Sequence, residues 1–166
     1  VPLAGGTTRR ISRAPSADEV KFEVDPPVWD QTGKNVFFLN GNELWRAPAD
    51  GSGGASFAKA PAGYRLEIIA PRQQRLFSTD GGRTAVLMTL NPSTKRVGFA
   101  KVDLKTGNIS QVFEEDKRYG GYGTEPTISP DGSVVAYVAE DALHPADIYI
   151  AGGERMTARK ATNVAP

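Results

Sequence analysis

The sequence predicts an all-β fold that is built from repeated four-stranded antiparallel units. Three observations support this prediction: one strand–turn–strand cassette occurs three times, further short apolar stretches follow each copy, and glycine and proline separate these stretches. The chain has 18 glycines and 12 prolines in 166 residues, enough to separate about a dozen short strands. No stretch keeps the apolar spacing of an α-helix over three turns.

The cassette places a tight turn between two apolar segments. Its copies are "WDQTGKNVFFL" from Trp29, "FSTDGGRTAVL" from Phe77 and "ISPDGSVVAYV" from Ile128. Each turn begins with Asp or Ser and ends with glycine, as a type I turn prefers, and these glycines are Gly33, Gly81 and Gly132. They are 48 and then 51 residues apart, about the length of one four-stranded propeller blade. The repeat therefore predicts the blades of a β-propeller.

The other strands of each unit are predicted from the segments around the cassettes. The first strands are "DPPVW", "QRLFS" and "EPTIS", and the third strands are "ELWRAP", "VGFAKVDL" and "ADIYI". The shorter, more polar segments "SFAKA", "ISQVF" and "MTARKAT" are the expected outer strands. The hairpin "VFFLNGNELW" is expected to turn at Asn40–Gly41, because both residues tolerate the positive φ of a type I′ turn.

These units divide the chain into blades over residues 27–61, 62–121 and 122–166. The middle unit has a longer lead-in, "AGYRLEIIAPRQQRLFS", which is assigned to its first strand. "RRISRAP" resembles "ARKATNVAP" near the C-terminus, so residues 1–26 are predicted to hold the outer strand of a preceding blade and a linker. The fold is therefore predicted to be a β-propeller fragment of about three blades plus part of another. Because each blade is stabilised by its neighbours, the remaining blades are expected in another segment or chain.

Composition narrows the classes of partner and chemistry. With 39% apolar and 23% charged residues the chain is globular, and 20 Lys plus Arg against 19 Asp plus Glu leave a charge of +1. Such a balance creates no field that attracts nucleic acid. No apolar run approaches the roughly 18 residues of a membrane span, and the N-terminus lacks a hydrophobic signal core, so a soluble chain whose export signal is already removed is expected. The absence of cysteine excludes disulfides, thiolate zinc sites and a cysteine nucleophile, and leaves the compartment open.

Several segments resemble a known family. "PTISPDGSVVAYV", "ADIYI" and "RKATNVAP" resemble the propeller repeats of the prolyl oligopeptidase and dipeptidyl peptidase family of serine peptidases, which are shared with the Tol-system periplasmic propeller. "PVWDQTGKNVFFLNGNELWRAP" is similar to the same unit, with "WDQTG" in place of Ser-Pro-Asp-Gly, and the resemblance covers about residues 9–166. It implies a non-catalytic propeller that stands over an α/β-hydrolase domain, limits substrate size and sometimes grips the substrate. It also favours an extracytoplasmic location.

No catalytic residue, metal ligand set or cofactor is predicted within this chain. The family's serine lies in a Gly-x-Ser-x-Gly elbow, and the most similar string, around Ser56, lies in a glycine-rich turn without the final glycine. His144 is the one histidine, and a triad needs it held against a serine and a carboxylate. As a metal ligand it lacks a second histidine or cysteine nearby.

Two adjacent stretches hold the candidate substrate-binding residues. Glu114 and Glu115 in "VFEED" are candidates through the resemblance, because dipeptidyl peptidases hold the substrate's amino terminus with a propeller glutamate pair. The alternative is a solvated charged run after an outer strand. Arg118, Tyr119 and Tyr122 in "RYGGYG" combine aromatic side chains with flexible backbone, as in a contact loop. The alternative for this stretch is an inter-blade connection with glycines at positive φ.

Two functions from different classes follow. The first is the non-catalytic propeller portion of a serine peptidase, which gates or positions peptide substrate for a hydrolase domain outside this chain. The second is a Tol-like or orphan propeller that binds a protein partner and belongs to no enzyme. The fold alone does not distinguish them, because one fold hosts many functions.

Overall fold

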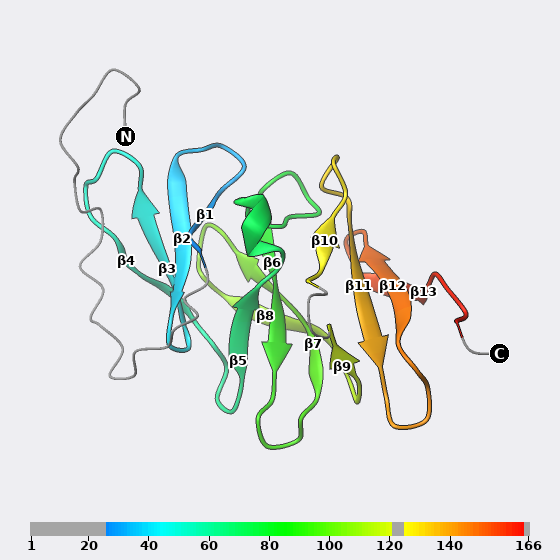
Figure 1. The fold of residues 1–166 in the computed structure, drawn as a ribbon. Coiled ribbons are helices and arrows are strands. Elements are labelled where there is room, and N and C mark those ends of the chain that lie inside the picture. Colours follow the sequence, from blue (N-terminus) through cyan, green and yellow to red (C-terminus); the bar gives the residue numbers. More distant parts are fainter. Residues whose placement is uncertain (1–25, 121–124, 165–166) are drawn as a thin grey trace.

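The computed structural model describes residues 26–120 and 125–164, which form three antiparallel sheets (Figure 1). The first sheet holds β1 (Val28–Trp29), β2 (Asn35–Asn40), β3 (Glu43–Pro48) and β4 (Ala55–Lys59). The second holds β5 (Arg65–Ile68), β6 (Thr84–Leu90), β7 (Val97–Asp103) and β8 (Ile109–Glu115). The third holds β10 (Thr127–Ile128), β11 (Val134–Glu140), β12 (Asp147–Gly152) and β13 (Thr157–Lys160), with β9 (Arg118–Tyr119) also paired to β11.

The three sheets are consecutive blades of a β-propeller fragment, as the sequence predicts. Each sheet orders its four main strands by sequence, and the sheets lie side by side along the molecule (Figure 1). The predicted third and outer strands are confirmed in all three blades. Among the described residues, η1 (Pro71–Gln73) is the one helix, and no helix is long and apolar enough to cross a membrane. The predicted part of a preceding blade lies outside the described residues.

The predicted strand–turn–strand cassette is present in every blade, with its middle copy shifted by one residue. In the first and third blades the turn glycine lies five positions after a paired inner residue: Gly33 after Val28, and Gly132 after Thr127. In the middle blade that inner residue is Phe77, whose carbonyl accepts from the Val86 amide, so the equivalent glycine is Gly82. The sequence analysis aligned Gly81 with Gly33 and Gly132, and the structure shows that Gly82 is the equivalent residue instead. Gly81 and Gly82 both have positive φ, 72° and 89°, so the turn pattern could not separate them.

The first hairpin also turns one residue later than predicted. Asn40 pairs with Glu43, which leaves Gly41–Asn42 as the two-residue loop. Of these two residues only Gly41 has a positive φ, 61°. A positive φ at the first central position alone is the geometry of a type II′ turn, so the predicted type I′ turn at Asn40–Gly41 is wrong.

The first strand of the middle blade, β5, lies within the predicted lead-in, but in its first half and not in the "QRLFS" segment at its end. The backbone between the two is interrupted by η1 and by two non-glycine residues at positive φ, Ala70 at 48° and Gln74 at 58°. After this interruption the chain contacts the first blade, where the Trp29 amide donates to Gln74 and the Leu76 amide donates to Trp29, both at 2.8 Å. The long lead-in therefore contains a strand followed by an inter-blade bridge.

Strand β9 is the counterpart of β5 in the third blade. Tyr119 pairs with Ala139 and Arg118 with Glu140, at the far end of β11 from β10. The inner edge of this blade thus consists of two short segments. Although the sequence division assigns residues 62–121 to the second blade, Arg118 and Tyr119 pair with the third.

Two apolar cores hold the blades together. We call the side of a blade that points toward the next blade in the chain its forward face, and the opposite side its back face. The first core joins the forward face of the first blade to the back face of the second, through Val28, Phe37, Leu44, Leu66, Leu76, Ala85, Leu87 and Val102. The second joins the second and third blades in the same way, through Phe77, Val86, Phe99, Val135, Tyr137, Ala139, Ala151 and Met156. Alternate residues of β6 therefore enter different cores, as the two-residue period of a strand requires.

Candidate functional site

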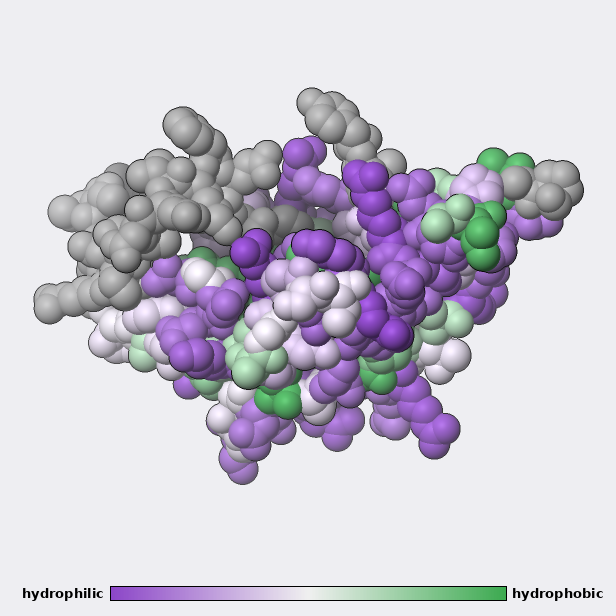
Figure 2. Space-filling view, turned by 90° about the horizontal axis from the view of Figure 1, so that it is seen from below, coloured by the Kyte–Doolittle hydropathy of each residue, from purple (hydrophilic) through white to green (hydrophobic). Residues whose placement is uncertain are grey.

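A cleft of about 830 Å³ opens between the second and third blades. It lies where the β6–β7 and β11–β12 loops project from the sheets, at the lower end of Figure 1. Its lining includes the apolar residues Met88, Leu90, Val97, Ala142 and Leu143 and the charged residues Glu67, Lys95, Asp116, Lys117, Arg118, Glu140 and Asp141. A cleft of this volume, lined by both apolar and charged residues, suits a small ligand or a peptide segment. Seen from this side, the surface is mostly hydrophilic and its hydrophobic groups are small (Figure 2).

Two of the predicted site residues, Arg118 and Tyr119, line this cleft. The Arg118 guanidinium makes one long contact, 3.5 Å, with the Glu140 carboxylate, and its side chain is largely exposed. The Tyr119 ring packs against the Tyr137 ring, at 4.6 Å between centroids. Tyr122 lies outside the described residues.

The predicted glutamate pair is divided between two different networks. Glu114 accepts a hydrogen bond from the Tyr64 hydroxyl at 2.6 Å and forms an ion pair with Arg96 at 3.2 Å. Glu115 accepts from the Tyr119 hydroxyl at 2.5 Å and forms an ion pair with Lys117 at 2.9 Å. Neighbouring residues on β8 point to opposite sides, which separates the two carboxylates. The structure therefore does not bring them together at the cleft, although Glu115 contacts its lining through Tyr119.

The Glu115 network fixes the protonation of the groups beside the cleft. Burial, followed by the hydrogen bond to Glu115, raises the pKa of Tyr119, so its hydroxyl stays protonated and acts as a donor. Burial lowers the pKa of Lys117, but contacts with Glu115 and Tyr149 outweigh it and the net shift is upward. The ammonium lies 4.1 Å from the centre of the Tyr149 ring, a cation–π distance. In this wall of the cleft, Glu115, Lys117 and Tyr119 thus form one connected network.

The β11–β12 loop forms the other wall and carries the histidine. Asp141 accepts hydrogen bonds from the backbone amides of Leu143 and His144, and its carboxylate lies 2.9 Å from the His144 Nδ1. The Leu143 amide and the histidine ring lower the pKa of Asp141. In the part of the chain that the structure describes, no serine hydroxyl contacts this ring. Ser56, the other residue considered for catalysis, lies within β4 and not at a strand–helix elbow.

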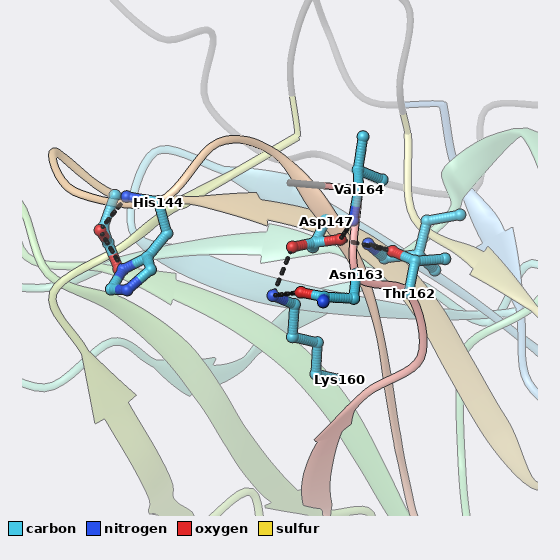
Figure 3. Close-up of polar contacts among 8 residues, drawn as sticks. His144, Asp147, Lys160, Thr162, Asn163 and Val164 are labelled. Atoms are coloured by element: carbon cyan, nitrogen blue, oxygen red, sulfur yellow. Dashed lines mark hydrogen bonds and ion pairs between the residues drawn. The ribbon is translucent and has the colours of Figure 1, made fainter. Parts of the chain in front are cut away.

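Asp147 anchors the segment that follows β13 at the end of the same loop (Figure 3). Its side chain is 2% exposed and accepts from the Lys160 ammonium at 2.6 Å, the Thr162 hydroxyl at 2.7 Å and the Val164 amide at 2.9 Å. The Thr162 hydroxyl also accepts from the Ile148 amide. These bonds hold the pKa of Asp147 at about 2.

We expect Asp147→Asn to lower the melting temperature by several degrees at neutral pH, because the amide cannot replace the charged contact with Lys160. A folded-state pKa below the unfolded value of 3.8 means that the contribution is present above about pH 4 and is lost as the pH falls toward about 2. Thermal unfolding between pH 7 and pH 2 tests this. The variant and the natural protein should converge in acid, while exposed Asp116→Asn should match the natural protein throughout. A constant difference across that range would exclude ionisation of Asp147 as the cause.

Sequence reasoning missed Lys117, Asp141 and Asp147. The "Asp-x-Leu-His" spacing around Asp141 is a local signal for a side chain that accepts loop amides, and could have been found. The partners of Asp147 lie 13 to 17 residues further along the chain, so no local pattern marks it. Within the described ranges, no group of three or more His, Asp or Glu side chains is placed to hold a metal ion.

Comparison with known proteins supports the fold. No family model matches the chain. A puromycin-hydrolysing peptidase of Mycobacterium tuberculosis matches 82% of this chain and 23% of its own length, at a TM-score of 0.51 and 11% identity. An oligogalacturonate lyase of Vibrio parahaemolyticus matches 84% of this chain and 52% of its own, at a TM-score of 0.47 and 12% identity. A TolB-type protein of Agrobacterium tumefaciens matches 86% of this chain and 63% of its own, at a TM-score of 0.44 and 12% identity.

All of these proteins have propeller-type folds. At sequence identities this low, the similarity to this chain shows a shared fold and no shared function. This chain spans about half the length of the oligogalacturonate lyases and about a quarter of the peptidase.

Proposed function

We propose that this chain is the non-catalytic propeller portion of a serine peptidase of the prolyl oligopeptidase type, and that it positions peptide substrate for a hydrolase domain. The observation that carries the proposal is the cleft between the second and third blades, whose walls are loops from two blades. Its apolar lining suits a peptide side chain, and charges of both signs at the cleft suit the polar backbone and termini of a peptide. The fold shared with the mycobacterial peptidase supports the same proposal.

The proposal separates peptide binding by the propeller from catalysis by the hydrolase domain, and this separation follows from what acyl transfer requires. A nucleophile needs an adjacent base and donors for the developing oxyanion. His144 and Asp141 form an imidazole–carboxylate pair in this chain, and the proposal assigns the nucleophile and the oxyanion site to the hydrolase domain. The role left to the propeller is to bind and orient peptide, which lowers the entropic cost of reaching the reactive geometry.

Leu143 gives the sharpest test of the cleft. Its side chain is 87% exposed at the tip of the β11–β12 loop and lines the cleft, so a bound peptide would cover it. We expect Leu143→Asp to weaken binding of the fluorescein-labelled pentapeptide Gly-Ala-Leu-Ala-Gly at least about tenfold, since one buried leucine contributes about 1.5–3 kcal/mol. Fluorescence anisotropy measures the affinity, and nitrogen-15 NMR shifts locate the peptide.

The matched control is Val164→Asp, which places the same charge at another exposed apolar residue outside the cleft. This variant should bind the peptide as the natural protein does. Equal weakening in both variants, or shifts confined to residues outside the 91–96 and 141–146 loops, would refute peptide binding at this cleft. Absence of binding to this and to longer peptides would favour the second candidate, a protein-binding propeller, for which an exposed leucine on a loop tip is also suited.

A further inference from the structure

The β6–β7 loop, which forms part of the cleft, is closed by hydrogen bonds around Asn91. The Asn91 amide donates to the Arg96 carbonyl at 2.9 Å, and the Asn91 carbonyl accepts from the Lys95 amide at 2.8 Å. The Asn91 side chain accepts from the amides of Ser93 and Thr94, at 3.0 and 3.2 Å. These bonds hold Lys95, near the end of the loop, at a φ of 64° in the left-handed region.

The β7–β8 loop of the same blade has the same geometry, with glycine at the equivalent position. The Asp103 amide donates to the Asn108 carbonyl at 2.9 Å, and the Asp103 carbonyl accepts from the Gly107 amide at 2.8 Å. The Asp103 side chain also accepts from two amides of its own loop. Gly107 has a φ of 77° and is the counterpart of Lys95. Glycine adopts this conformation without steric cost, whereas the Cβ of a lysine is strained there.

The Lys95 side chain lines the cleft without a partner. The lysine and arginine side chains of the lining are Lys95, Lys117 and Arg118. The Lys117 ammonium is paired with Glu115 at 2.9 Å, and the Arg118 guanidinium contacts Glu140 at 3.5 Å. Lys95 is exposed, and its ammonium forms no hydrogen bond or ion pair with any residue that the structure describes. An anionic ligand group can therefore bind Lys95 without first breaking an ion pair.

The strain at Lys95 is not repaid by any described contact of its side chain. Residues held in an unfavourable backbone conformation cluster at functional sites, where the strain is tolerated because the side chain is needed. The cleft thus combines a free ammonium on the β6–β7 loop with the exposed Leu143 side chain on the β11–β12 loop. A peptide that carries both a leucine and a carboxylate would match the two groups.

We infer that the Lys95 ammonium binds a carboxylate of the peptide in the cleft, from an acidic side chain or from the peptide's C-terminus. Lys95 is then a specificity-determining residue that sets the charge of the preferred peptide. The inference rests on the proposed peptide-binding role and adds the chemical class of the peptide to it. Because the ion pair is exposed, we expect a preference of about fivefold, which salt weakens by screening.

Three peptides with fluorescein at the amino terminus test the preference by fluorescence anisotropy. The neutral reference is Gly-Ala-Leu-Gln-Gly with an amidated C-terminus. The second peptide has Glu in place of Gln and keeps the amide, and the third is the reference sequence with a free C-terminal carboxylate. We expect at least one of the two carboxylate peptides to bind about fivefold more tightly than the reference at low salt. The peptide that does so identifies the source of the carboxylate.

Lys95→Gly separates binding from folding, because glycine removes both the ammonium and the backbone strain. We expect this variant to melt at a higher temperature than the natural protein, to bind the neutral peptide equally well and to lose the preference for a carboxylate. Lys95→Gln, which keeps the strain, should lose the preference without the gain in stability. The matched control is Lys105→Gln, which removes an exposed lysine from the equivalent β7–β8 loop and should keep the preference.

The outcomes distinguish this inference from the proposed function. Equal affinities for all three peptides in the natural protein, or a preference that persists in Lys95→Gly, would overturn the inference while peptide binding stands. If none of the three peptides binds, the proposed function itself is refuted, and this inference with it.

Discussion

Replacing Phe99 with alanine is expected to lower the free energy of unfolding by about 3–5 kcal/mol, the range for a buried phenylalanine whose removal leaves a cavity. Its side chain is 0% exposed in the second core. The ring lies 5.3 Å from Phe113, 5.6 Å from Tyr119 and 5.4 Å from Tyr137, measured between centroids. One aromatic ring therefore joins both blades and supports the tyrosine that lines the cleft.

Urea unfolding followed by circular dichroism measures this effect, with Phe113→Ala as the matched control. Phe113 belongs to the same cluster but is only partly buried, so its loss should cost less. The Phe99 variant should also bind the pentapeptide more weakly, because Tyr119 loses its support. If Phe99→Ala costs no more than Phe113→Ala, the central position of this ring in the core has been overestimated.

The sequence predicted the elements whose signals are local. The third and outer strands of each blade are short apolar or polar runs between glycine turns, and they were found at or within a few residues of their predicted ends. The middle lead-in was assigned as a whole to the first strand, but only Arg65–Ile68 forms that strand, because Ala70 and Gln74 adopt positive φ without being glycine. Propensity gives no warning of such positions, since only the packing between two blades stabilises them.

Only one wall of the cleft could be predicted from the sequence. Arg118 and Tyr119 were selected from a local mixture of charge and aromatic residues, and they line the cleft. The opposite wall, including Asp141 and Leu143, is brought there by the pairing of β9 with the end of β11, two segments about 20 residues apart, which no local pattern encodes. The adjacent glutamates looked like one ammonium site in the sequence, but strand geometry gives each its own partners.

Gly98→Ala is expected to destabilise the protein by about 3 kcal/mol, at the upper end of the cost of overpacking. Gly98 pairs with Glu114 beside the register shift between β7 and β8, and a Cβ there would lie 2.0 Å from the Phe113 carbonyl oxygen and 2.9 Å from the Glu114 Cα. Both atoms belong to backbone, so β8 itself must move, and with it Glu114 and Glu115. Gly132→Ala is the control: its Cβ meets nothing within 4 Å, and only the positive φ of 72° costs about 1–2 kcal/mol. Urea unfolding should separate the two variants, and equal destabilisation would show that β8 does not need this close approach.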